Sequence, residues 1–131
     1  MILPTELRTI ARARLKDAEV LLAAGRYEGS VYLCGYSVEI ALKARVCRAL
    51  KWPGFPSTKK EFEGYHSFRT HNLDVLLHLS GAEVKIKAKY LAAWSVVAAW
   101  ETDTRYKRIG SATSTDATKM INSAKVLLGV L

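Results

Sequence analysis

The chain has 131 residues, of which 50% are apolar and 24% charged, and only three are prolines. These values fit one globular domain over residues 1–131 and exclude a disordered chain, a collagen-like repeat and a low-complexity linker. Twenty basic against twelve acidic side chains give a net charge of +8 at pH 7, which favours anionic partners such as RNA, nucleotides or an acidic protein face.

The cysteines and the apolar runs bear on the compartment of the protein. Cys34 and Cys47 are expected on one helix, where thirteen residues separate them by about 20 Å, too far for a disulfide. Met1–Glu6 has no basic leader, and the longest apolar run, Tyr90–Trp100, is too short to cross a bilayer. We therefore expect a cytoplasmic protein that makes no membrane contact.

The first half of the chain has two strong helical patterns. Glu6–Ala24 alternates an apolar with a charged face, with Pro4 suited to the first turn and Gly25 to the end of the helix. Tyr27–Lys51 is apolar around most of its circumference, which is typical of a central helix packed on several sides. The prolines and glycine of Trp52–Pro56 end this second helix.

The segment that follows is less regular. Ser57–Arg69 is polar and aromatic and supports no more than one helical turn, capped by Ser57. Thr70 has the properties of an N-cap for a short helix that ends at Gly81. The apolar face of that short helix consists of Leu73, Leu76 and Leu77.

The rest of the chain continues the helical pattern. Glu83–Thr102 is expected as one long helix, Asp103–Ser114 as a loop and Thr115–Val130 as a final helix. No segment has the alternation of a convincing strand. The sequence therefore predicts an all-α, up-and-down bundle of four main helices plus a short one. The apolar face of the long helix consists of Ile86, Tyr90, Ala93, Trp94, Val97 and Trp100.

The sequence lacks the motifs of common enzymes and metal sites. It has no phosphate-binding glycine loop, no His-Glu-x-x-His pattern and no nucleophile elbow. Its histidines, His66, His71 and His78, lack the spacing of metal ligands, since two turns separate His71 from His78 on one helix. We expect no metal and no cofactor, and the conventional interpretation of His71 is a residue that hydrogen-bonds its neighbours.

Polar residues on the central helix are the more informative feature. Glu39 and Lys43 are one turn apart in the order that favours an ion pair, and Tyr32 and Tyr36 continue the same face. One interpretation is a structural pair with tyrosines that tie helices together. The other is that this face lines a groove and presents donors to a phosphate or a base. Arg105-Tyr106 then supplies a forked donor and a stacking ring from the following loop.

Four ordered motifs together indicate a family. They are GRYEGS at 25–30, YSVEIALK at 36–43, THNL at 70–73 and RY at 105–106. In this order the chain resembles the HEPN superfamily of small helical bundles, and it is similar to the C-terminal domain of kanamycin nucleotidyltransferase. The resemblance covers roughly residues 15–128.

The resemblance implies a HEPN-like bundle that acts as a homodimer, alongside a minimal nucleotidyltransferase made as a separate chain. In that arrangement the helical protein binds the nucleotide or RNA, and the partner carries the metal and the chemistry. The family's recurrent positions correspond to Glu39, Lys43, His71, Arg105 and Tyr106, which are the candidate nucleotide- or RNA-binding residues.

Many HEPN members are metal-independent RNases, marked by an arginine followed after four to six residues by a histidine. None of the three histidines here follows an arginine at that spacing. The resemblance therefore implies a non-catalytic module that binds a nucleotide or RNA. The alternative is a HEPN-type RNase toxin of a toxin–antitoxin pair, with a displaced active site in which His71 meets Arg69 or Arg105.

A further alternative is an oligomeric interaction protein without a ligand. In that case Trp52, Phe55 or Trp100 is expected to be exposed and to form the interface between chains.

Overall fold

The computed structural model describes all 131 residues and contains six α-helices, two short 3₁₀-helices and no strand. The expected all-α class is confirmed. Apart from the helices, Ile2 and Phe55 form an isolated antiparallel bridge. The elements are α1 (Pro4–Ala23), α2 (Tyr27–Leu50), η1 (His66–Phe68), α3 (Leu73–Leu79), α4 (Glu83–Lys89), α5 (Leu91–Ala98), η2 (Thr102–Tyr106) and α6 (Ser114–Val130).

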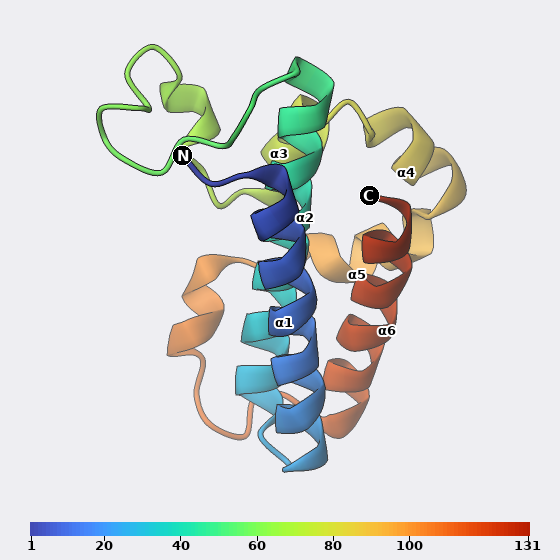
Figure 1. Cartoon of the computed structure of the whole chain (residues 1–131). Helices are drawn as coiled ribbons and strands as arrows, with labels where there is room; N and C mark the ends of the chain where they lie inside the picture. The colour runs from blue at the N-terminus through green and yellow to red at the C-terminus, as the bar shows by residue number, and fades with distance from the viewer.

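Three long helices, α1, α2 and α6, form the body of the bundle (Figure 1). α1 starts at Pro4, as expected, and the Glu6 carboxylate accepts a hydrogen bond of 3.1 Å from the backbone N–H of Leu3. Gly25, with φ of +73°, makes the turn that reverses the chain, a conformation that favours glycine. α2 then runs antiparallel to α1, and α6 lies along both of them.

α2 is the central helix, as its all-round apolar pattern predicted. It packs against α1, α3, α6 and η2. Ser30, Ser37 and Glu39 are buried on it, the first two donating hydrogen bonds to backbone carbonyls. The main core contains Cys34, Val38, Leu42, Leu76, Leu77, Ile86, Trp94, Val97, Ile121 and Leu127.

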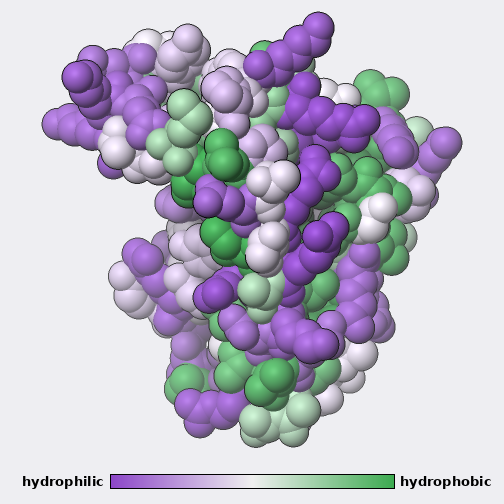
Figure 2. Space-filling model, viewed as in Figure 1, coloured by the Kyte–Doolittle hydropathy of each residue, from purple (hydrophilic) through white to green (hydrophobic).

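A smaller apolar cluster lies where the chain leaves α2. Phe55 is 2% exposed and packs with Phe62, while Trp52 is half-buried against this cluster. Trp100 is 6% exposed and belongs to the main core. The expectation of exposed aromatic residues is therefore wrong for Phe55 and Trp100, because both fill the interior. Figure 2 shows that the loop projecting beyond the bundle at this end is largely hydrophilic.

The segment expected as one long helix is two helices, α4 and α5. The backbone leaves helical geometry at Tyr90, with φ of −131°, and α5 ends at Ala98. On α5, the Trp94 indole N–H donates a hydrogen bond to a carboxylate oxygen of Asp74 on α3, with 3.2 Å between nitrogen and oxygen. The expected loop after it also contains η2.

The ends of the shorter helices differ from the expectation. Asn72, and not Thr70, caps α3: its side chain accepts a hydrogen bond of 3.1 Å from the Val75 N–H. The Thr70 hydroxyl accepts from the Asn72 N–H one step earlier. In the preceding segment Thr58, and not Ser57, caps the first turn, because its hydroxyl accepts from the backbone N–H of Glu61. The expectation of a single turn is also wrong, since η1 forms a second one before Arg69.

The structure also bears on the expectations that the two cysteines form no disulfide and that no segment crosses a bilayer. Cys34 and Cys47 are both buried free thiols. No helix combines the length and the apolar character that crossing a bilayer requires.

Candidate functional site

Glu39, on the central helix, joins three of the candidate residues. Its side chain is 2% exposed, and one carboxylate oxygen lies 3.1 Å from the Lys43 ammonium one turn later. The other oxygen lies 2.7 Å from Nδ1 of His71, which precedes α3. Because a buried carboxylate requires charged or hydrogen-bonded partners, these contacts form a single polar unit inside the bundle.

The two partners of Glu39 differ in exposure. The Lys43 side chain is 19% exposed, and its ammonium lies 5.4 Å from the centre of the Phe55 ring. The His71 side chain is 57% exposed. When His71 Nδ1–H donates to Glu39, Nε2 is the ring nitrogen left to contact a ligand. Lys43 thus neutralises the buried carboxylate, whereas His71 presents an oriented imidazole at the surface.

Tyr36 connects this unit to the rest of the site. Its ring packs edge to face against His71, with 6.2 Å between ring centres, and against Tyr32, with 5.1 Å. Burial raises the pKa of the Tyr36 hydroxyl to about 12, with further contributions from Tyr32 and from the negative charge of Glu39. Tyr36 is therefore neutral at physiological pH, and its hydroxyl can both donate and accept.

Arg105 and Tyr106 lie on η2, at the other end of this tyrosine row. The Arg105 guanidinium is 4.7 Å from the centre of the Tyr106 ring, and Tyr106 is 75% exposed. Electrostatic interaction with Tyr106 and contact with the Tyr32 hydroxyl raise the pKa of Arg105 further. Arg105 thus offers a permanent positive charge beside an exposed aromatic ring.

A groove of about 430 Å³ lies between the start of α2 and η2. Arg26, Arg105 and Lys107 line it together with Tyr32, and none of these three cations forms an ion pair with a carboxylate. Glu28 also lines the groove, where its carboxylate accepts a hydrogen bond from the backbone N–H of Gly110. The groove is therefore a basic site with an aromatic wall.

The five candidate residues thus form two groups, joined by Tyr36 and Tyr32. Glu39, Lys43 and His71 make one group, and Arg105 and Tyr106 make the other. Of the five, only Arg105 lines the groove, and Glu39, Lys43, His71 and Tyr106 do not.

Two further cations of the groove were not selected from the sequence. Arg26 stands inside the GRYEGS motif, and Lys107 directly follows the RY motif. Their positions beside these two motifs are the only sequence signal that marks them.

The family comparison covers the first part of this arrangement. The HEPN domain model matches residues 5–60, which include α1, α2 and the Glu39–Lys43 pair. The HEPN resemblance is confirmed here. His71, Arg105 and Tyr106 lie outside the HEPN match, and the structure alone brings His71 to the matched segment. No curated protein and no solved structure matches the chain.

The RNase alternative requires an arginine beside His71, and the structure allows its two candidates to be compared. The Arg69 guanidinium packs over the Phe62 ring, 5.7 Å from its centre. Arg105 contacts Tyr32, which in turn packs on Tyr36 against His71. Arg105 is therefore linked to the imidazole through two tyrosine rings.

Proposed function

We propose that this HEPN protein binds RNA or a nucleotide in the groove between the start of α2 and η2. The observation that carries the proposal is the set of three cations, Arg26, Arg105 and Lys107, that line the groove without ion-pair partners. Guanidinium groups match the oxygens of a phosphate with two parallel hydrogen bonds. Ligand phosphates would then replace the missing counter-charges.

The aromatic residues of the site suit the rest of such a ligand. Tyr106 is exposed beside Arg105 and offers a face on which a base can stack. His71, at the far end of the tyrosine row, offers Nε2 to a ribose hydroxyl or a base edge. In this proposal Glu39 and Lys43 are positioning residues, because they hold His71 and do not touch the ligand.

RNA and mononucleotide binding can be measured directly at low ionic strength. We expect a labelled single-stranded RNA to bind, by fluorescence anisotropy, with an affinity that falls steeply as salt is added. Calorimetry with ATP and GTP then distinguishes a mononucleotide from a longer strand. Arg105→Ala removes one forked arginine–phosphate contact, and Arg26→Ala removes the second arginine. Each variant should bind RNA about tenfold more weakly than the wild type.

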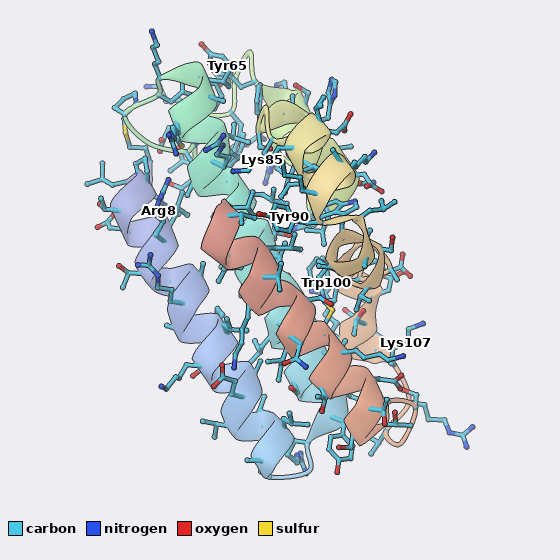
Figure 3. All side chains as sticks on the ribbon, turned by 90° about the vertical axis from the view of Figure 1, so that its right-hand side faces the viewer. Arg8, Tyr65, Lys85, Tyr90, Trp100 and Lys107 are labelled. Atoms are coloured by element: carbon cyan, nitrogen blue, oxygen red, sulfur yellow. The ribbon has the colours of Figure 1, made fainter.

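Lys85→Ala is the matched control, since it removes one exposed cation at a distance from the groove. Figure 3 shows Lys85 toward the end of the molecule where Tyr65 lies, and Lys107 toward the other end. Absence of binding at low salt, or equal loss of affinity in Lys85→Ala and Arg105→Ala, would overturn the proposal.

The HEPN match supports a proposed assembly. We propose that the chain forms a homodimer and acts with a separate minimal nucleotidyltransferase. Light scattering after size exclusion should give twice the chain mass of 14.5 kDa. Co-purification with a nucleotidyltransferase chain encoded beside it tests the second part, and a monomer that captures no such chain contradicts this assembly.

Metal-independent RNA cleavage is the second candidate function, favoured by one contact. The 2.7 Å contact with Glu39 orients the His71 imidazole as a carboxylate orients a catalytic histidine. Under this alternative, purified protein cleaves RNA in the presence of a chelator, and His71→Ala abolishes the cleavage. Equal residual cleavage by both proteins would exclude it.

A further inference from the structure

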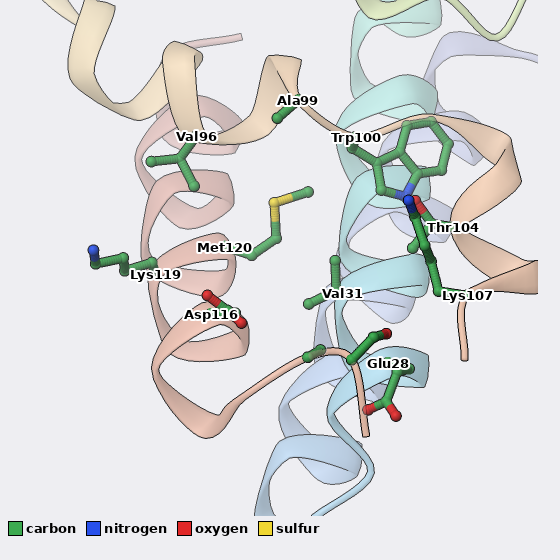
Figure 4. Close-up of a pocket in the computed structure, with 12 residues that line it drawn as sticks. Glu28, Val31, Val96, Ala99, Trp100, Thr104, Lys107, Asp116, Lys119 and Met120 are labelled. Atoms are coloured by element: carbon green, nitrogen blue, oxygen red, sulfur yellow. The ribbon is translucent and has the colours of Figure 1, made fainter. Parts of the chain in front are cut away.

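A second cavity, of about 390 Å³, lies at the junction of α2, α5 and α6 (Figure 4). Val31 from α2, Val96 from α5 and Met120 from α6 supply much of its apolar wall, and the Trp100 ring closes one side. This volume is within the range of cavities that hold small organic ligands. The cavity is also apolar enough to favour a ligand with a hydrophobic body.

Trp100 contributes a hydrogen-bond donor that has no partner in the protein. The residue is 6% exposed, and its indole Nε1 is buried without an acceptor. In Figure 4 this nitrogen lies on the side of the ring that faces Thr104 and Lys107, which also line the cavity. Because buried donors are almost always paired, this indole N–H requires an acceptor from outside the protein, either water or a ligand.

The charged residues at the rim of the cavity bear on the charge of that ligand. Glu28 and Asp116 each use their carboxylate to accept a backbone N–H, from Gly110 and Thr113 respectively. Lys107 and Lys119 also line the cavity, and neither lies within 4.0 Å of a carboxylate oxygen. Both rim carboxylates thus have hydrogen-bond donors within the protein, and the charge of Lys119 acts on Asp116, whereas the Lys107 ammonium has no carboxylate beside it.

We propose that this cavity binds a small aromatic carboxylate. Its ring occupies the space between Trp100 and Met120, where an indole ring and a thioether both make favourable contacts with an aromatic body. Its carboxylate accepts the Trp100 N–H once the exposed side chain of Lys107 moves aside, and Lys107 or Lys119 supplies the counter-charge. This cavity adjoins the proposed RNA groove and shares Glu28, Thr104 and Lys107 with it, but Arg105 lines only the groove and Ala99 only the cavity.

Calorimetry on the full chain with three probes tests the chemistry of the ligand. We expect 1-naphthoate to bind at least tenfold more tightly than 1-naphthylmethylamine, which has the same rings and the opposite charge. Octanoate keeps the carboxylate and removes the aromatic body, so it should also bind at least tenfold more weakly. Equal affinity for the amine overturns the charge argument, and equal affinity for octanoate overturns the aromatic one.

Substitutions then test the location. Ala99 is exposed and lines the cavity, so Ala99→Trp should fill the space without disturbing the core and abolish naphthoate binding. Ala92→Trp is the matched control, because Ala92 is also exposed, lies on α5, the helix that Ala99 directly follows, and does not line the cavity. Naphthoate affinity that is unchanged by Ala99→Trp, or equally reduced in the control, overturns the proposed site.

Trp100→Phe removes the indole N–H and keeps an aromatic ring. If circular dichroism shows the variant folded, naphthoate should bind about tenfold more weakly, as expected for one lost hydrogen bond to a charged group. Arg105→Ala should leave naphthoate binding unchanged, and Ala99→Trp should leave RNA binding unchanged. These last two variants separate a failure of this site from a failure of the proposed function.

Discussion

Nδ1 of His71 lies 2.7 Å from a carboxylate oxygen of Glu39, a residue that precedes it by 32 positions. This contact ties the segment before α3 to the middle of α2. It also completes the pairing of a carboxylate that is 2% exposed, whose other oxygen is bound by Lys43. The fold and the candidate site therefore depend on the same buried charge.

Glu39→Gln should lower the free energy of unfolding by roughly 3 kcal/mol, because it leaves the half-buried Lys43 ammonium without a counter-charge. Urea denaturation measures the change. The double variant Glu39→Leu with Lys43→Met is the control, since an apolar pair replaces both charges and should recover much of the loss. A Glu39→Gln protein as stable as the wild type would show that this pair is well hydrated.

Gly35→Ala should destabilise the protein, although alanine is the better helix former by about 1 kcal/mol. A Cβ at this position of α2 would lie 2.2 Å from the Trp100 indole, which is fixed in the core against Tyr36. Overpacking of this kind costs about 1–3 kcal/mol. Thermal and urea denaturation should show the loss.

Gly129→Ala is the matched substitution in α6. Nothing lies within 4 Å of a Cβ at Gly129, so this variant should be as stable as the wild type or slightly more stable. Equal effects at the two glycines would contradict the role assigned to Trp100.

Cys34 and Cys47 should be unreactive in the folded protein. Burial raises the pKa of the Cys34 thiol to about 12, with a smaller contribution from the charge of Glu19, and burial also raises the pKa of Cys47. Because the thiolate is the reactive form, a thiol reagent at pH 8 should label neither residue. In denaturant both should react, and rapid labelling of the native protein would contradict this account.

The start of α6 should loosen in acid. Hydrogen bonds with the backbone N–H and with the hydroxyl of Thr113 lower the pKa of the Asp116 carboxyl. The positive charge of Lys119 lowers it further. A lowered pKa in the folded state stabilises the fold above the pKa of the unfolded chain. This stabilisation is lost as the pH falls through the folded value.

Hydrogen exchange of the first amides of α6, measured between pH 6 and pH 2, should report this loss. Asp116→Asn keeps the size of the side chain and removes its titration. The variant should therefore show faster exchange at pH 6 and little further change in acid. An identical pH dependence in both proteins would assign the effect to other carboxyl groups.

Apolar periodicity predicted the long helices well. α1, α2 and α6 lie close to the expected boundaries, because each has a continuous helical pattern and a clear stop or cap. The break at Tyr90 could not be predicted in the same way. No proline or glycine marks it, and the apolar spacing continues across it, so contacts such as that of Trp94 with Asp74 determine it.

The candidate site was predictable to a different degree at each residue. The Glu39–Lys43 contact follows from a one-turn spacing on a single helix. His71 could be connected with them only through the HEPN resemblance, because its contact spans 32 positions. Arg26 and Lys107 were not selected, since nothing local distinguishes them from the other exposed cations of a chain with twenty basic residues.

The α1–α2 hairpin also has a consequence for the order of folding. These two helices follow one another in the chain and pack more extensively than any other pair of elements, so their contacts close only a short loop. We expect the hairpin to form first during refolding, with α6 docking onto it later. η2 buries no residue, so its amides should become protected last, after the scaffold that carries them is complete.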